Sequence, residues 1–448
     1  MRNIFREIWE DKRGNSLIIA AAALPLLLGS AGLATDTIQW ALWKRQLQRA
    51  ADSAAIAGVY DRYHNDGATT TTDDAVDHDL DLNNSLKDKV ALVSGYPKVS
   101  FPADNTALKL TDQVTVELAV QRPLSFSSMF MTNAPVIKTS ATAATVPGGD
   151  KYCVVSLEKG NKTGIQGSGN ASVQTDCAWI TNSISNNAAA GQGDAELWAT
   201  AIAAAGGIAQ SANWHVGRYD PYAPALDDPY ADVNPDPSDV ADKCGTGSLP
   251  ALAIPNGGGP NKPTTMTFNA GCYSGILVDS GETITLNPGI YYISGGNVTL
   301  RGALIAKNGV TIVLTNRDTS PTATIGSFDM QAGATLDIEA PTTGDYSGIA
   351  IYQDRRATDN TVGGGNITSS SPNKINGNSS QKVVGALYFP NQQLTYNGGG
   401  TGAAQCTQFV VRRVVFTGNN KTDINQFTSD CADKGIKDIQ AFRVRLVA

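Results

Sequence analysis

The six cysteines are the residues whose chemistry the sequence constrains most tightly. All lie after residue 150, and none belongs to a Cys-x-x-Cys pair, which argues against a zinc site or a thioredoxin-like centre. An even number of cysteines beyond an export signal indicates disulfides formed in an oxidising compartment. Pairing in sequence order gives three loops of similar size. We therefore predict the bonds Cys153–Cys177, Cys244–Cys272 and Cys406–Cys431, although other pairings remain open.

Two carboxylates, Asp337 and Glu339, are candidates for acid–base chemistry. They stand two residues apart in an expected strand and so share one of its faces. Glycoside cleavage needs such a pair, with the pKa of one member raised, but an exposed acidic face of a β domain gives the same spacing. No Gly-x-Ser-x-Gly nucleophile motif is present. We expect no enzymatic activity and keep a surface-anchored carbohydrate-active enzyme as the alternative.

Carbohydrate binding without catalysis is a second form of that alternative. Aromatic side chains can form a platform for sugar rings, or they can pack inside the fold. Six tyrosines fall in or beside expected strands: Tyr273, Tyr291, Tyr292, Tyr346, Tyr352 and Tyr388.

A cluster of oxygen ligands between residues 227 and 239 suggests a weak calcium site at Asp228, Asp232 and Asp236. The spacing of Asp232 and Asp236 resembles the start of a calcium-binding loop. However, Pro237 stands where such a loop needs its turn glycine, and Lys243 where it needs its closing glutamate. A solvated, proline-stiffened loop explains the cluster better, so we expect no cofactor.

The composition excludes further classes of protein. The 448 residues carry 34 basic and 41 acidic side chains, a formal net charge of −7, whereas nucleic-acid binders usually have a basic surplus. Only 3 histidines are present, which leaves little material for a histidine metal site. Glycine clusters at 257–259, 363–365 and 398–400 lack the Lys-Ser/Thr of a phosphate loop. We expect no nucleic-acid partner.

An uncharged, apolar stretch near the N-terminus, residues 17–34, is long enough for a membrane helix. A secretory signal peptide cut before Thr35 or Asp36 is the alternative. The helical apolar pattern continues past residue 34, which favours a retained single-pass anchor. Basic residues flank both sides of the stretch, so the cysteines decide the orientation. They place the C-terminal part on the oxidising, non-cytoplasmic side of the membrane.

The chain divides by composition into five regions. We predict a cytoplasmic tail (1–15), a transmembrane helix with its extension (16–60), a small α+β unit (61–147), a mixed region with a Pro/Asp-rich loop (148–270) and a β-helix-like domain (271–448). Apolar spacing predicts helices at 74–93 and 194–205 as well.

The fold class is predicted to be mainly β. Short β-type runs follow one another after residue 272, separated by Gly or Asn turns, as in 283–286, 290–293 and 310–314. Such runs are typical of a sandwich, a barrel or a solenoid. We favour a right-handed parallel β-helix, with a β-sandwich as the alternative.

The N-terminal third resembles the TadE/TadG-like family of Tad (Flp) pilus-assembly proteins. The resemblance lies in Asp11–Ser16, in the apolar run with Pro25, in Leu47–Gly58 and in the block Val114–Ala144. Many TadG-like proteins carry a von Willebrand-type domain next, but its metal-binding Asp-x-Ser-x-Ser is absent here. The remainder instead looks like the β-rich, Cys-containing extension of some TadG-like proteins, and the residues that carry this likeness are Cys177 with Asn182 and Ser183, Asp228–Asp232, Asn287–Tyr291 and Gly295 with Gly296. The resemblance implies a bacterial envelope protein that helps to build or decorate an adhesive pilus. It also implies that residues 61–147 are a pilin-like unit, that the anchor lies in the bacterial inner membrane, and that the C-terminal part is periplasmic or extracellular.

Resemblance to this family also implies partners and a possible processing site. The partners are other Tad pilus components and pilins, and a surface carbohydrate is a possible ligand. A prepilin peptidase cuts after a glycine that follows basic residues, and Gly14 follows Lys12 and Arg13. Pilins usually carry Glu at the fifth position after the cut, but here that position is Ile19. We therefore expect the protein to work uncut, as a minor pilin or an assembly accessory.

Overall fold

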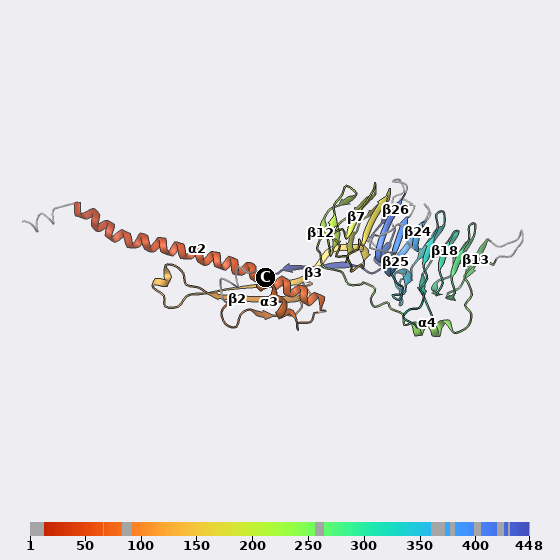
Figure 1. The fold of residues 1–448 in the computed structure, drawn as a ribbon, viewed down its shortest axis with the longest axis horizontal. Coiled ribbons are helices and arrows are strands. Elements are labelled where there is room, and N and C mark those ends of the chain that lie inside the picture. Colours follow the sequence, from red (N-terminus) through yellow and green to blue (C-terminus); the bar gives the residue numbers. More distant parts are fainter. Residues whose placement is uncertain are drawn as a thin grey trace, which may run out of the picture. The chain divides into compact units, whose positions relative to one another are not determined.

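The computed structural model describes residues 13–65, 67–82, 92–255, 264–359, 372–376, 381–397, 405–418, 425–428 and 431–447. The chain forms two compact units. The N-terminal unit comprises residues 1–147 and 442–448, and the β unit comprises residues 148–441 (Figure 1). The β unit is thus inserted into the sequence of the N-terminal unit.

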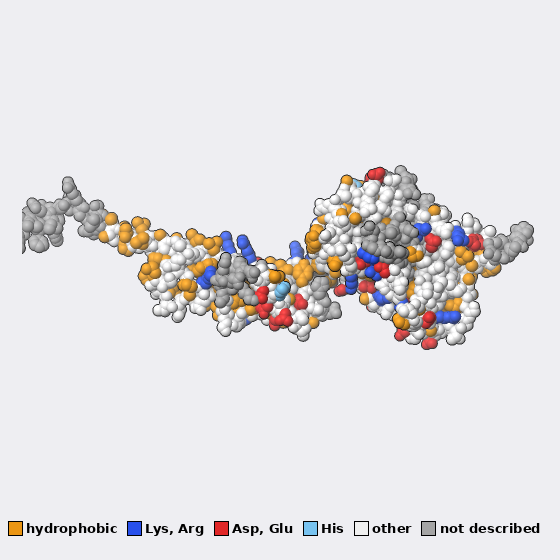
Figure 2. Space-filling model, in the orientation of Figure 1, with side chains coloured by type: hydrophobic (Ala, Val, Ile, Leu, Met, Phe, Trp, Pro, Cys, Tyr) orange, Lys and Arg blue, Asp and Glu red, His pale blue; other side chains and the backbone are white. Residues whose placement is uncertain are grey.

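A single long helix, α2 (Arg13–His64), begins the N-terminal unit. Its first half carries exposed leucines and is long and apolar enough to cross a membrane; Figure 2 shows the hydrophobic side chains along it. Its second half buries a face of small residues that includes Leu47, Ala51 and Ala55. The long apolar helix predicted at the N-terminus is therefore confirmed.

A small sheet packs on the second half of α2. Its strands β1 (Lys98–Ser100), β2 (Thr111–Gln121) and β3 (Val136–Ser156) pair in antiparallel order, β1 with β2 and β2 with β3. The short helix η1 (Ser127–Met129) lies between β2 and β3, and β28 (Gln440–Leu446) leads the chain back into this unit. Helix α3 (Thr72–Leu82) packs on α2 through Val76 and Leu80. Of the helix predicted at 74–93, residues 83–91 lie outside the described residues, and Leu92 forms a β-bridge with Val120.

The β unit is a stack of coils whose neighbouring strands are parallel. Each coil contributes strands to two or three ladders, and apolar side chains fill the interior. The first group of coils comprises β3 and the strands β4 (Ile165–Gly169), β5 (Ser172–Thr175), β6 (Ala178–Thr181), β7 (Ala189–Gly191), β8 (Glu196–Ala199), β9 (Ile202–Ala204), β10 (Ile208–Ala209), β11 (Trp214–Val216) and β12 (Tyr219–Pro221). This parallel pairing supports the predicted β-helix and is unlike the antiparallel sheets of a β-sandwich.

The second group of coils begins after residue 264. Its strands are β13 (Thr265–Phe268), β14 (Gly271–Tyr273), β15 (Ile276–Val278), β16 (Thr283–Leu286), β17 (Gly289–Ser294), β18 (Val298–Leu300), β19 (Ala303–Ala306), β20 (Val310–Thr315), β21 (Phe328–Met330), β22 (Thr335–Glu339), β23 (Ile349–Gln353), β24 (Asn373–Asn376), β25 (Lys382–Asn397) and β26 (Thr407–Gly418). The strand β27 (Asn425–Phe427) and the short helix η2 (Ala432–Lys434) follow.

The two groups meet in the middle of the stack, where the last coil of the second group pairs with the first coil of the first group. Strand β26 pairs with β25 on one side and with β3 and β4 on the other, and β27 pairs with β5. Figure 1 shows β26 and β25 between the β7–β12 coils and the β18–β13 coils. We call this junction between the first and the last coil the seam.

The connection between the two groups, residues 222–264, is called here the return segment. It must join β12 at one end of the stack to β13 at the other. Along the way it forms α4 (Pro237–Cys244), which Asp236 caps by accepting a hydrogen bond from the Ser238 amide at 2.8 Å. Asp followed by Pro at the first helical position is a helix start, which explains why this sequence departs from a calcium loop.

The helix predicted at 194–205 is wrong, because the structure places β8 and β9 there. Ala199, Ala201 and Ile202 are buried between neighbouring coils. Alanine favours a helix in isolation, but in this stack the ladder hydrogen bonds and the tight interior decide the conformation.

Glycines at one corner of the stack allow successive coils to touch. A β-carbon on Gly296 would overlap the carbonyl oxygen of Ser274, and one on Gly326 would overlap that of Gly296. We expect Gly296→Ala to destabilise the β unit by about 2–3 kcal/mol, because a backbone carbonyl cannot move aside. Gly247→Ala is the matched control, since nothing lies within 4 Å of its β-carbon. Chemical denaturation followed by circular dichroism measures both, and equal midpoints would contradict the expectation.

Candidate functional site

A charged cavity of about 430 Å³ opens at the seam. We call it the seam cavity. Its walls come from parts of the chain that the fold brings together: the segments after β3 and β6, strands β25 and β26, the turn after β23 and the return segment. The residues that line it are Leu157, Glu158, Lys159, Gly160, Asn182, Leu226, Asp228, Arg355, Pro390, Asn391 and Arg412.

One wall of the seam cavity is held by Glu158, whose side chain is 1% exposed. Its Oε2 accepts hydrogen bonds from Nε of Arg412 at 2.9 Å and from Nη1 of Arg413, and its Oε1 accepts one from the Gly160 amide at 2.7 Å. Burial raises the pKa of Glu158, but these hydrogen bonds and the charges of Arg412 and Arg413 outweigh it and leave the pKa below its ordinary value. Glu158 is therefore an ionised carboxylate at neutral pH and cannot serve as a general acid.

Asp359 extends this charge cluster. It forms ion pairs with Arg413, with Arg412 at 3.4 Å and with Lys162 at 4.0 Å. The cluster crosses the seam, because Glu158 and Lys162 follow β3, whereas Arg412 and Arg413 belong to β26. The cluster therefore joins the first coil to the last.

The opposite wall holds Asp228, one of the predicted calcium ligands. Its Oδ2 accepts hydrogen bonds from Nη2 of Arg355 at 2.8 Å and from the Tyr388 hydroxyl at 2.6 Å. Burial and the negative charge of Asp228 raise the pKa of Tyr388, so the phenol stays protonated and donates. Asn182 fixes the same segment, because its side chain donates to the Leu226 carbonyl and accepts from the Leu226 amide. These contacts fasten the return segment to the stack.

The other two calcium candidates have separate partners. Asp232 pairs with Nζ of Lys437 at 2.6 Å, and Asp236 caps α4. Both line a second cavity, of about 490 Å³, together with Asp239 and Asp345. Within the described ranges, no three Asp, Glu, His or Cys side chains are arranged to hold a metal ion. The structure therefore does not bring Asp228, Asp232 and Asp236 together as one set of ligands.

The acidic pair Asp337 and Glu339 lies on the outer face of strand β22, as expected from the alternation of side chains along a strand. Asp337 pairs with Nζ of Lys307 at 2.7 Å, and Glu339 lies 3.6 Å from Nζ of Lys434. The carboxylate of Asp337 raises the pKa of Lys307. Neither residue lines the two cavities described above. The lysines give both carboxylates a surface ion-pairing role.

The tyrosines proposed as a sugar platform mostly face inward. Tyr291, Tyr346, Tyr352 and Tyr388 are buried, and the rings of Tyr352 and Tyr388 stack at 5.1 Å. Tyr346, Tyr352 and Tyr388 pack in one cluster with residues of the return segment, and the Tyr352 hydroxyl donates to the Val233 carbonyl. Tyr291 instead lies inside the coils, where its hydroxyl donates to the carbonyls of Phe268 and Asn287.

Three disulfides brace the β unit and join Cys153 to Cys177, Cys244 to Cys272, and Cys406 to Cys431. Their Cα atoms are 5.8, 5.4 and 5.6 Å apart, respectively, within the usual range for a disulfide. The first and third flank a small cavity of about 140 Å³ at the seam.

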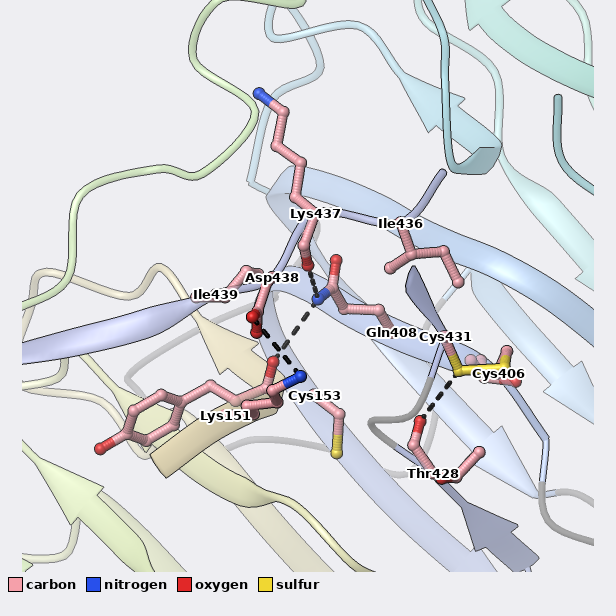
Figure 3. Close-up of a pocket in the computed structure, with 12 residues that line it drawn as sticks. Lys151, Cys153, Cys406, Gln408, Thr428, Cys431, Ile436, Lys437, Asp438 and Ile439 are labelled. Carbon is pink, nitrogen blue, oxygen red and sulfur yellow. Dashed lines mark hydrogen bonds and ion pairs between the residues drawn. A yellow bond between two sulfur atoms is a disulfide. The ribbon is translucent and has the colours of Figure 1, made fainter. Parts of the chain in front are cut away.

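This small cavity is where the chain leaves the β unit. Figure 3 shows Gln408 pointing toward the segment that contains Lys437, with the Cys406–Cys431 bond beside it. Nε2 of Gln408 donates to the Lys437 carbonyl at 3.0 Å, and the Tyr152 amide donates to the Ile439 carbonyl at 2.8 Å. Lys151 and Asp438 form an ion pair at 3.5 Å. The entering and leaving segments of the β unit are therefore bonded to each other at the seam.

Comparison with known proteins bears on the N-terminal helix. Residues 14–61 match the Tad family model, described as "Putative Flp pilus-assembly TadE/G-like". The N-terminal segment is TadE/G-like. The match covers most of α2 and confirms the resemblance carried by the apolar run and the Leu47–Gly58 motif. No curated protein and no solved structure matches the chain significantly. This match supports an association of the protein with a Tad pilus.

The charge cluster at the seam escaped the sequence analysis, although one signal of it was present. Arg412 and Arg413 interrupt the apolar run 409–416 of strand β26. Two adjacent charges in such a strand indicate buried acidic partners, because an unpaired buried charge is costly. The partners Glu158 and Asp359 are far away in sequence and could not be identified by spacing.

Proposed function

We propose that the protein is a minor pilin or an assembly accessory of a Tad (Flp) pilus, held in the bacterial inner membrane by α2. The observation that carries this proposal is the TadE/G-like match over the one described helix that is long and apolar enough to span a bilayer. The β unit then stands on the periplasmic or extracellular side, where its disulfides form. Its partners are pilins and other Tad components, and its outer surface presents a rigid binding face, which suits an adhesive role.

We propose no catalytic activity for the β unit. Asp337 and Glu339 are each paired with a lysine, and the pKa of Glu158 is lowered rather than raised. Glycoside hydrolysis by two carboxylates needs one of them protonated near neutral pH, and the lowered pKa of Glu158 does not suit that role.

The absence of an acid at position 19 shapes the expected processing. Cutting after Gly14 would create an N-terminal ammonium on Asn15, while Ile19 stands where pilins carry a pairing glutamate. Residues 15 to 35 contain no carboxylate that could take its place. An unpaired charge among apolar helices is costly. The uncut chain keeps its basic tail in water, which favours an assembly factor or a terminal subunit.

Crosslinking in cells, followed by purification and intact-mass measurement, tests the proposal. We expect a membrane-bound species that retains residues 1–14 and is crosslinked to pilins or other Tad components. A species that begins at Asn15 would contradict the uncut form, and one that begins at Thr35 or Asp36 would contradict the anchor. Capture of the intact protein without any pilus component would contradict the assignment to the pilus.

A further inference from the structure

An uncharged apolar tip projects from the sheet of the N-terminal unit between β2 and β3. It comprises residues 123–135, and no charged side chain occurs between Arg122 and Lys138. Met129 and Phe130 are each 75% exposed, and Met131 is 51% exposed. Contiguous large apolar side chains on a protein surface mark a contact with a partner or a membrane.

The tip is fixed to α2 just beyond its apolar half. The amides of Phe126 and Ser127 donate to the two carboxylate oxygens of Asp36, at 2.8 and 2.5 Å. Ser125 donates through its hydroxyl to Gln39 at 3.0 Å. The Phe126 ring packs so closely on Gly32 that a β-carbon there would overlap it. The tip therefore lies beside residues 32–39 of α2, where the apolar stretch ends.

Aromatic and basic side chains lie farther along α2 than the residues that contact the tip, and Arg122 of the neighbouring segment lies beside them. The ammonium of Lys44 lies 5.2 Å from the ring centre of Trp40, and the guanidinium of Arg122 lies 5.2 Å from that of Trp43. Trp with Lys or Arg is the residue pattern of a membrane–water interface. At about 1.5 Å of helix rise per residue, Trp43 stands about 10 Å above Asp36. The tip is thus on the hydrocarbon side of the interfacial residues.

The polar groups by which the tip contacts α2 are hydrogen-bonded, as a low-dielectric boundary requires. The carboxylate of Asp36 is buried and accepts from two amides and from the Ser127 hydroxyl. An unpaired carboxylate at this level would be costly. In contrast, the side chains of Met129, Phe130 and Met131 are stabilised when their exposed apolar atoms leave water.

We propose that residues 123–135 insert into the lipid bilayer beside α2, as a second contact with the leaflet on the side of the β unit. This inference rests on the proposed membrane anchor and extends it. The occupant is lipid rather than a protein, because the tip continues the apolar surface of a helix that spans the same bilayer, and Arg122 and Lys138 flank it where anionic headgroups lie. Two contacts fix the tilt of α2, whereas one helix alone leaves it free.

Depth-dependent quenching in full-length protein tests the insertion. Met129→Cys, Leu27→Cys and Leu108→Cys are each labelled with an environment-sensitive fluorophore, which reacts only at the new thiol because all six native cysteines are bonded. The proteins are reconstituted in vesicles of phosphatidylcholine and phosphatidylglycerol that contain spin-labelled lipids. Leu108 is the matched control, since it is 67% exposed but lies in the loop before Gln113, whose carbonyl accepts a hydrogen bond from Arg62 at the far end of α2.

We expect lipid quenching of the label at 129, strongest with the spin label near the headgroup, and several-fold weaker quenching at 108. If water-soluble quenchers act on the label at 129 as strongly as on the label at 108, the inference is overturned. A label at 129 shielded from both lipid and water would also overturn it, in favour of a covering protein. The label at 27 reports separately on the anchor: if lipid does not quench it, the membrane-spanning proposal fails, whatever the tip does.

Discussion

Arg413→Ala is expected to destabilise the β unit by about 3–5 kcal/mol. The side chain is fully buried and bonds to Glu158 and Asp359 across the seam. Removing one member of a buried ion pair leaves the other charge unneutralised in a low-dielectric site, which costs far more than the net value of the intact pair. Urea denaturation of the full chain, followed by tryptophan fluorescence, measures the loss.

Arg412→Ala is the matched control for this substitution. It removes the neighbouring guanidinium from the same cluster, but the Arg412 side chain is 31% exposed. Water therefore replaces many of the interactions that the substitution removes, and we expect the β unit to lose about 1 kcal/mol of stability or less. Equal losses for the two variants would show that Arg413 has no special role at the seam.

The pH dependence gives an independent check on the same cluster. Because the pKa of Glu158 in the folded chain is below its ordinary value, its contribution to stability is complete above the pKa of the unfolded chain. That contribution is lost as the pH falls through the lowered folded pKa. Glu158→Gln should flatten this acid limb of the stability profile, and an unchanged limb would show that other carboxylates control it.

The double variant Cys244→Ser/Cys272→Ser is expected to lose about 3–4 kcal/mol and to release the return segment. The bond closes a separation of 28 residues, and the stabilisation comes from the restricted unfolded chain. It also ties α4 to β14. Without it, the described remaining ties near α4 are weaker, such as the Arg317 hydrogen bonds to the carbonyls of Gly245 and Gly247.

Limited proteolysis distinguishes the local effect from the global one. We expect cleavage within 222–255 to become much faster in this variant. The control variant Cys406→Ser/Cys431→Ser removes a loop of similar size, 25 residues, and should lose similar stability without accelerating cleavage of the return segment. Identical cleavage patterns in the two variants would contradict a dedicated role for the Cys244–Cys272 bond.

The sequence predicted the features that depend on local pattern. The apolar run of α2, the β-rich composition and the parallel solenoid follow from periodicity and turn residues, as in 283–286 and 310–314. What escaped prediction depends on long-range pairing. Nothing local indicates that Glu158 meets Arg413, or that 194–205 is strand rather than helix, because neighbouring coils supply the deciding contacts. Asp228 was singled out for its oxygen ligands, but its partner is Arg355 rather than a metal ion.

The seam also governs the order in which the β unit can fold. Ser156, at the end of β3, donates its hydroxyl to the Arg412 carbonyl 256 residues later. During export, the coils of residues 148–221 cross the membrane before the rest of the β unit and therefore have an unpaired edge along β3 and β4. That edge stays open until β26 has been synthesised and exported. An exposed strand edge invites association with other chains, and contacts this distant form slowly. Folding of the β unit is thus coupled to complete translocation, and a chain stalled before residue 407 would carry two open edges.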